Sequence, residues 1–273
     1  MKKALIILAF ITAHCSLFTV HLHSQPCLPN GIIFTTQAQI DSFPINYPNC
    51  TIIEGFVQIG GEPHVSDISH LDGLSVVTYI GGDLIIINND FLDNLDGLMP
   101  MDSIGGSVTC SNNPITGLLS DLFGSAFGSS VGGDGLFTGL PRLKDFYGLD
   151  SLWFLGGSLT IEANDSLYSL EGIDNIKAGS IDGVYITQNP ALSTCEVQSI
   201  CDYLSNQVGP VEIHNNSMGC NNQAEVMDAC ESIGIHEIST TDFFTIYPNP
   251  CTDVARLRYL IYMGLMEERF VNY

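Results

Sequence analysis

The chain has 273 residues and a formal net charge of −22, from 8 Lys and Arg against 30 Asp and Glu. Between Gln25 and Ala255 the only Lys or Arg residues are Arg142, Lys144 and Lys177, so no cluster of positive charge is available for nucleic acid or an anionic membrane surface. With 45% hydrophobic and 14% charged residues the chain is too apolar to be disordered. Its length suits one large domain or two small ones.

The N-terminus has the layout of a secretory signal peptide. Lys2 and Lys3 precede an apolar run that starts at Ala4, and Ser24-Gln25 offers a small residue before a cleavage point. Histidines interrupt the run, which stays shorter than the roughly 20 apolar residues of a membrane span. We therefore expect residues 1–25 to be removed on export, and the mature chain to be secreted or held at the outer cell surface with no membrane span.

Export places the cysteines in an oxidising compartment, where disulfides form. The chain has 9 Cys, and six disulfide candidates lie in two groups toward the ends of the apolar body: Cys27, Cys50, Cys195, Cys201, Cys220 and Cys230. The four later cysteines allow three pairings, and the sequence does not choose among them. Cys15 falls within the expected signal peptide, and Cys110 and Cys251 are left over.

The middle of the chain is a repeat. Glycine pairs begin at residues 81, 105, 132 and 156, about 24 residues apart, a period typical of solenoids. Each pair precedes a short stretch of alternating apolar and polar residues, as expected for a strand with one buried face. The same alternation recurs around Val57, Val184 and Val211.

Two further elements recur in each unit. An Asn follows each strand at a fixed offset, at Asn89, Asn113, Asn164, Asn189 and Asn216. A Leu-x-x-Leu-x-Gly-Leu run or its equivalent comes next and contains Leu92, Leu95, Leu143, Phe146, Leu167 and Leu170. We expect the Asn side chains to form a ladder at left-handed turns, and the glycines to make tight corners.

Units of this kind predict a mainly β fold, a parallel solenoid with a single sheet and about seven coils of ~24 residues. We expect it to occupy residues 26–232, with coils from Thr51 to Cys220. The segment 120–141 breaks the pattern and indicates a degenerate coil with a loop. Helical spacing at 36–43, 195–206 and 222–232 predicts short helical caps at both ends.

The cysteine-bracketed opening with Thr35-Thr-Gln-Ala-Gln-Ile40, the glycine-pair coils and the segment Ser193-Thr-Cys-Glu-Val-Gln-Ser-Ile-Cys-Asp-Tyr-Leu204 together resemble secreted Bacteroidetes proteins built on receptor L-domain-like leucine-rich repeats. The resemblance covers about 27–231. It implies an extracellular binding or adhesion module without catalytic residues, and it favours a Cys27–Cys50 disulfide.

The C-terminal part carries a second resemblance. After a polar linker expected at 233–242, Phe243-Phe-Thr-Ile-Tyr-Pro-Asn-Pro250 resembles the start of the sorting domain read by the type IX secretion machinery. We assign 243–273 to a partial domain of this kind. Cys251 stands where that family has another residue, and the stretch from Arg256 to Tyr273 lacks the later strands expected of the complete β-sandwich.

The sequence predicts no catalytic residue, cofactor or metal site. Gly128-Ser-Ser130-Val-Gly132 matches G-x-S-x-G but lies in a Gly/Ser-rich stretch rather than between a strand and a helix. One row of acids precedes the repeat glycine, at Asp72, Asp96 and Glu171, with Tyr147 interrupting it. Stacked carboxylates can be relieved by Ca²⁺, and a hydrated surface row is the simpler interpretation.

We expect an exported, non-enzymatic protein that binds a protein or glycan through the outward face of its sheet. Strand alternation places these residues on that face: Ile85, Ile87, Thr109, Thr160, Glu162, Tyr185, Thr187, Glu212 and His214. The alternatives are a polysaccharide lyase or hydrolase on a β-helix scaffold, favoured by paired acids flanked by aromatic residues in a cleft, and a structural surface-layer component.

Overall fold

The computed structural model describes residues 25–62, 66–116, 129–206, 209–233, 245–247, 254–260 and 266–272. The chain divides into two compact units, Met1–Cys230 and Glu231–Tyr273. The expected signal peptide lies outside the described residues except for Gln25, as does the expected linker after Ile233.

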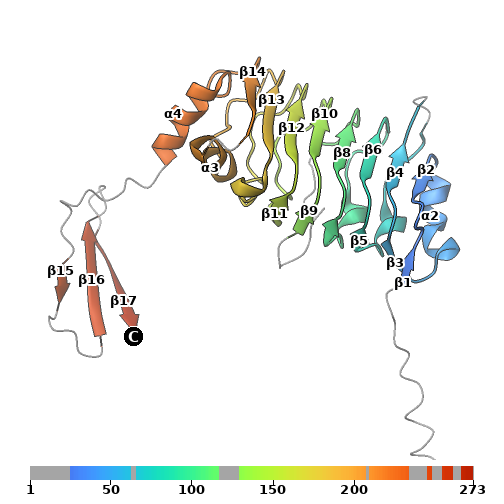
Figure 1. Cartoon of the computed structure of the whole chain (residues 1–273), viewed down its shortest axis with the longest axis horizontal. Helices are drawn as coiled ribbons and strands as arrows, with labels where there is room; N and C mark the ends of the chain where they lie inside the picture. The colour runs from blue at the N-terminus through green and yellow to red at the C-terminus, as the bar shows by residue number, and fades with distance from the viewer. Residues whose placement is uncertain are drawn as a thin grey trace, which may run out of the picture. The chain divides into compact units, whose positions relative to one another are not determined.

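The first unit is the predicted parallel solenoid (Figure 1). Its larger sheet has eight strands in the order β14-β13-β12-β10-β8-β6-β4-β2, and every neighbouring pair is parallel. The strands are β2 (Ile32–Phe34), β4 (Val57–Gly60), β6 (Leu84–Ile87), β8 (Val108–Ser111), β10 (Gly135–Thr138), β12 (Ser158–Glu162), β13 (Gly183–Thr187) and β14 (Val211–His214). The sequence identified all of these strands except β2, which adds a coil at the N-terminal end.

The expectation of a single sheet was incomplete, because each of the earlier coils contributes a second strand. A six-stranded parallel sheet has the order β1-β3-β5-β7-β9-β11, formed by β1 (Gln25–Cys27), β3 (Cys50–Ile53), β5 (Tyr79–Ile80), β7 (Ser103–Ile104), β9 (Ser129–Val131) and β11 (Leu152–Leu155). Two strands of this sheet have only two residues. Segments so short carry no alternation, so the sequence did not reveal them as strands.

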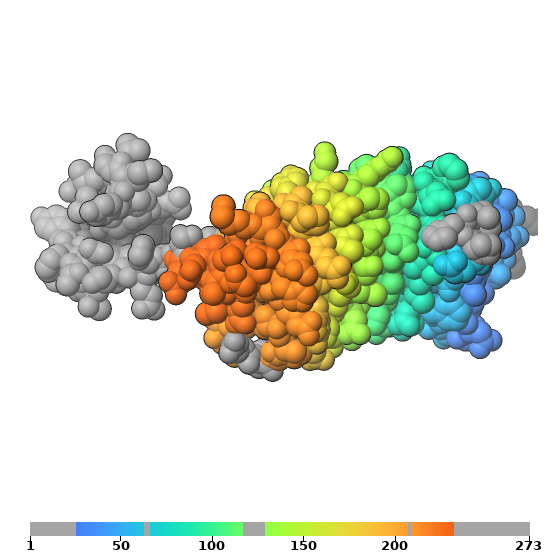
Figure 2. Space-filling model, turned by 90° about the horizontal axis from the view of Figure 1, so that it is seen from above, coloured from blue at the N-terminus to red at the C-terminus, as the bar shows by residue number. Residues whose placement is uncertain are grey.

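The Leu-rich runs contribute their apolar residues to the core of the solenoid. Leu95, Phe146 and Leu170 are all buried in one continuous apolar core. Two of the runs end in short 3₁₀ helices, η1 (Asp72–Leu74) and η2 (Asp96–Leu98), whereas η3 (Ala178–Ser180) lies beside β11. The colours in Figure 2 follow one another in bands across this unit, so each coil contacts chiefly the coils before and after it.

The recurring asparagines form the predicted ladder inside the coils. Asn189 is fully buried; its side-chain amide donates to the carbonyls of Ile161 and Thr187, and its Oδ1 accepts the backbone N–H of Asn164 at 3.0 Å. The left-handed backbone, however, belongs to the preceding residue in each coil: Asn88, Asn112, Ala163, Gln188 and Asn215 have φ between 54° and 58°. The prediction that the ladder residues themselves take this conformation was wrong.

The glycine pairs have a different role from the one predicted. None of Gly81, Gly105 and Gly132 has a positive φ. Instead, a Cβ on Gly132 would collide with the backbone carbonyl of Gly105, and a Cβ on Gly105 with that of Gly81. These glycines therefore permit close backbone contact between successive coils rather than a tight corner.

Helices close both ends of the solenoid, as predicted. They are α2 (Gln37–Asn46), α3 (Gln198–Asn206) and α4 (Gln223–Ile233). In α2, Ile40 and Phe43 are buried, and Gln39 Oε1 accepts the N–H of Thr36 at the helix start. In α3, Ile200 and Leu204 are buried at the spacing of one helical face.

Disulfides join the same ends. Cys27 pairs with Cys50, Cys195 with Cys220, and Cys201 with Cys230. The last two bonds decide among the three pairings that the sequence left open. Both tie segments of the C-terminal cap, where a coil has a neighbour on one side only.

The interrupted coil is more regular than its sequence indicates. Strand β10 pairs in full register with β8 and with β12, so the degenerate coil keeps its place in the larger sheet. Residues 117–128, which include most of the irregular segment before it, lie outside the described residues.

The second unit contains a three-stranded antiparallel sheet of β15 (Thr245–Tyr247), β16 (Val254–Leu260) and β17 (Met266–Asn272). Strands β16 and β17 lie in the C-terminal stretch that was expected to lack the later strands of a complete β-sandwich.

Candidate functional site

The outward positions of the larger sheet form two straight rows. Strand register aligns one row across all eight strands, consisting of Ile33, Gln58, Ile85, Thr109, Leu136, Thr160, Tyr185 and Glu212. The second row consists of Ile87, Ser111, Thr138, Glu162, Thr187 and His214. We call the surface formed by these two rows the sheet face.

The structure brings all nine predicted face residues into these rows. Most are half-buried or exposed, whereas Thr187 is buried, with 8% of its surface accessible. Sequence reasoning missed Ile33 because β2 lies before the first recognised coil. It missed Leu136 and Thr138 because their coil was read as degenerate. It also left out Gln58 and Ser111, which the same alternation places on this face.

Polarity changes along the sheet face. Toward β2 the rows carry Ile33, Ile85 and Ile87, and Ile33 is 49% exposed. Toward β14 they carry Glu162, Glu212 and His214, and the Glu162 carboxylate accepts a hydrogen bond from the Gln188 side chain at 2.8 Å. The rows contain no Lys or Arg, so a phosphate or sulfate group would find no cation on this face.

The acidic row does not assemble a metal site. Asp72 and Asp96 begin η1 and η2, the Asp72 carboxylate lies 3.4 Å from His70 Nδ1, and Glu171 accepts a hydrogen bond from the Tyr147 hydroxyl at 2.5 Å. Among the described residues, no group of three or more His, Cys, Asp and Glu side chains is arranged to hold a metal ion.

On the flank of the solenoid, two tyrosines form hydrogen bonds with two carboxylates of adjacent coils. Tyr147 donates to Glu171 in the next coil, and Tyr168 donates to Asp145 in the previous coil at 3.4 Å. The hydrogen bond to Glu171 raises the pKa of Tyr147 to about 12. The negative charge of Asp145 raises the pKa of Tyr168. These tyrosines were not predicted as binding residues, although Tyr147 stood out as the interruption of the acidic row.

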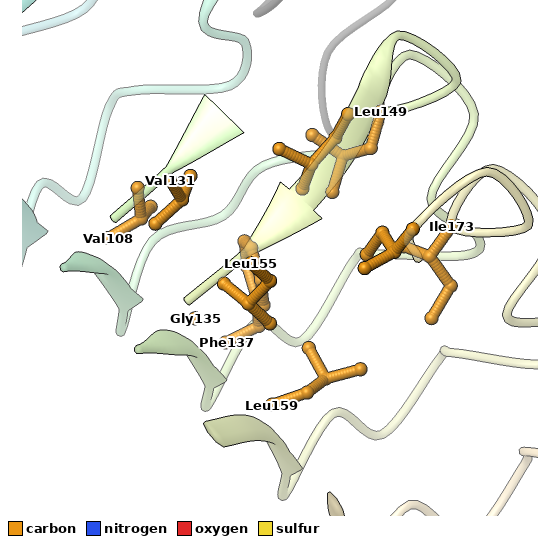
Figure 3. A pocket seen from close by; sticks show the side chains of 10 residues that line it. Val108, Val131, Gly135, Phe137, Leu149, Leu155, Leu159 and Ile173 are labelled. Carbon is orange, nitrogen blue, oxygen red and sulfur yellow. The ribbon is translucent and has the colours of Figure 1, made fainter. Parts of the chain in front are cut away.

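One cavity of the described part of the chain is apolar and lies inside the solenoid (Figure 3). Its volume is about 10 Å³, counted as space open to the centre of a water-sized sphere. That is room for about one water molecule. Its lining includes Val108, Phe137, Leu155 and Leu159 around Gly135, and no polar group is present to hold a substrate.

Two nucleophilic groups of the described residues, Cys110 and Ser130, are poorly placed for chemistry. Cys110 is buried, and this burial raises the pKa of its thiol to about 12, so the thiolate is strongly disfavoured. In the G-x-S-x-G match, Ser130 lies within β9 rather than on a strand-to-helix turn. Gly128 of that match lies outside the described residues.

Comparisons of this chain with protein-family models, with curated proteins and with solved structures found no match. Its three disulfides indicate an oxidising environment. Among the residues that the structure describes, no helix has the length and apolar character needed to cross a membrane.

Proposed function

We propose that this chain is an exported, non-enzymatic binding or adhesion protein that contacts a protein or glycan through the sheet face. The observation that carries the proposal is the sheet face itself, two in-register rows of outward side chains on a parallel sheet. Because β-branched side chains such as Ile85 and Thr109 have few rotamers, ordering them on binding costs little conformational entropy.

The chemistry of the sheet face restricts its partner. Ile33, Ile85 and Leu136 offer apolar contact, Tyr185 combines a ring with a hydroxyl, and Glu212 adds negative charge at one end. Such a surface favours a partner with apolar or neutral polar groups and disfavours a strongly anionic one.

We also propose that the solenoid is of the receptor L-domain-like, leucine-rich-repeat kind, exported by the type IX secretion machinery. The glycine-pair repeat, the Asn ladder and the capping disulfides support the first part. The Tyr247-Pro248-Asn249-Pro250 motif supports the second. Deleting 243–273 from the gene in a type IX-competent bacterium should retain the protein in the periplasm, and unchanged secretion would contradict this route.

Binding is tested with the full chain on a glycan array and by pull-down of extracellular proteins. Thr109→Arg and Leu136→Arg place a large charged group in the middle of the sheet face, and Ser103→Arg places the same group on the outward side of the smaller sheet. For a protein or glycan held by the sheet face, we expect the first two variants to abolish binding and the third to retain it.

Three results would contradict the proposal. Equal loss of binding in all three Arg variants would remove the sheet face as the site. Turnover of a labelled polysaccharide would favour the lyase or hydrolase alternative. Ordered self-assembly without a ligand would favour a structural surface-layer component.

A further inference from the structure

A second surface, separate from the sheet face, carries its own recognition chemistry. Two exposed tyrosines lie on adjacent coils at the Leu-rich flank, where Tyr147 is 53% and Tyr168 46% exposed. Each hydroxyl is bonded to a carboxylate of the other coil, Tyr147 to Glu171 and Tyr168 to Asp145. We call these four residues the tyrosine–carboxylate cluster.

The backbone beneath the cluster is rigid. The N–H of Tyr168 donates to the carbonyl of Lys144 at 2.9 Å, and the N–H of Phe146 donates to the carbonyl of Glu171 at 2.9 Å. Phe146 is fully buried beside Tyr147. Tyrosine has few rotatable bonds, and here the hydroxyl is also restrained, so each ring is positioned before any ligand arrives.

Each tyrosine hydroxyl donates its single proton to a hydrogen bond with a carboxylate, while about half of each tyrosine remains exposed to solvent. A half-exposed ring offers apolar area to a flat partner such as the C–H face of a pyranose. The carboxylates keep further lone pairs, which accept hydrogen bonds from donor groups such as sugar hydroxyls, and such charge-assisted bonds are stronger than neutral ones.

The same charges restrict the class of ligand. The exposed Lys144 beside Asp145 offsets part of this charge, but the two carboxylates of Asp145 and Glu171 still disfavour uronic acids and sulfated sugars. The charged groups also leave no water-free apolar centre of the kind that protein-binding hot spots need. We propose that the tyrosine–carboxylate cluster binds a neutral, hydroxyl-rich oligosaccharide. This site is separate from the sheet face, so a test of one proposal does not decide the other.

The test uses the full chain and isothermal titration with neutral hexasaccharides of β-1,4-linked glucose, mannose and xylose and of α-1,4-linked glucose. An oligogalacturonate and a Lys-rich peptide serve as anionic and cationic comparison probes. We expect at least one neutral sugar to bind, and neither comparison probe to bind at this cluster.

Variants locate the binding. Tyr147→Leu and Tyr168→Leu remove a ring from an exposed position, and each should weaken binding by about tenfold, which corresponds to about 1.4 kcal/mol. Tyr79→Leu is the matched control, because Tyr79 is an exposed tyrosine on the smaller sheet. It should leave binding unchanged, as should Thr109→Arg on the sheet face.

A further variant separates the ring from its hydrogen bond. Tyr147→Phe keeps the aromatic face and removes the bond to Glu171, so it should weaken binding less than Tyr147→Leu. Thermal melts of all variants check that the fold is retained.

Several outcomes would overturn the proposal. Failure of every neutral sugar to bind would do so, as would binding that survives both Leu variants or that is lost in Thr109→Arg. Preference for the Lys-rich peptide would make the cluster a protein contact, and cleavage of a bound sugar would make it a catalytic one.

Discussion

Among the described residues, Gly135 is the only glycine at an inward position of the larger sheet. The residues beside it on the two neighbouring strands both have branched side chains. Strand register aligns it with Val108 on one side and Leu159 on the other. The apolar cavity of about 10 Å³ lies at this place, with Phe137 and Leu155 in its lining (Figure 3). The cavity is therefore the volume of a missing side chain, partly filled by these two neighbours.

Gly135→Ala should stabilise the protein. A Cβ at this position would lie 3.4 Å from Leu155 Cδ1 and 3.5 Å from Phe137 Cε2, which are ordinary van der Waals distances. Burying one methyl group is worth about 0.8 kcal/mol. Replacing glycine also lowers the entropy of the unfolded chain, which is worth about 0.4–1 kcal/mol. The expected gain is about 1–2 kcal/mol, or roughly 3–6 °C in melting temperature for a domain of this size.

The assay is thermal and urea unfolding of the full chain, followed by circular dichroism under oxidising conditions. Gly132→Ala is the matched control, since its Cβ would collide with the carbonyl of Gly105, and overpacking costs about 1–3 kcal/mol. Gly135→Val should gain no more than Gly135→Ala, because the extra methyl groups exceed the open space. A neutral or destabilising Gly135→Ala, or a tolerated Gly132→Ala, would refute this reading of the two glycines.

Three further predictions concern the ladder, the left-handed positions and the exposed tyrosine. Asn189→Ala should lower the free energy of unfolding, measured in urea, by about 2–4 kcal/mol, because it leaves buried backbone groups without partners. Asn175→Ala removes one exposed hydrogen bond and should lower it by less than about 1 kcal/mol. Equal losses in the two variants would argue against the ladder. Ala163→Asn should stabilise by about 0.5–1 kcal/mol, since Ala163 has φ 55° and Asn tolerates the left-handed region better than Ala; a loss in the same unfolding assay would contradict this. The hydroxyl of Tyr147 should ionise about two units above its usual pKa of 10.0, near 12, because it donates to Glu171. Since the pKa of Tyr147 is higher in the folded than in the unfolded chain, the stabilisation from this bond is present below pH ~10 and is lost as the pH rises toward ~12. Glu171→Gln should lower the midpoint of tyrosine ionisation in an ultraviolet absorbance titration. An unchanged midpoint would show that Glu171 does not cause the raised pKa.

Much of the architecture was predictable because a solenoid repeats a local pattern. The spacing from the glycine pair to the strand, to Asn89 and then to Leu95 lies within a single coil, so it can be read along the chain. The larger sheet, the buried Leu-rich runs and nine positions of the sheet face all follow from it.

Other features arise only where different coils meet. The glycine pairs were interpreted as corners because a sequence shows no neighbour, whereas the carbonyl of Gly105 explains why Gly132 has no side chain. The short strands of the smaller sheet are too brief to alternate. The cysteine pairing depends on which segments of the cap lie side by side, and the sequence alone allowed three answers.

The sequence by itself determined the coil, its inside and its outside, since these depend on residue type and spacing within one repeat. Only the tertiary structure decided what each coil meets in the next: the bonds of Tyr147 and Tyr168 to carboxylates across coils, the cavity at Gly135 and the second sheet. The physical reason is that these contacts are set by the register between stacked backbones, and that register exists only once the coils are packed.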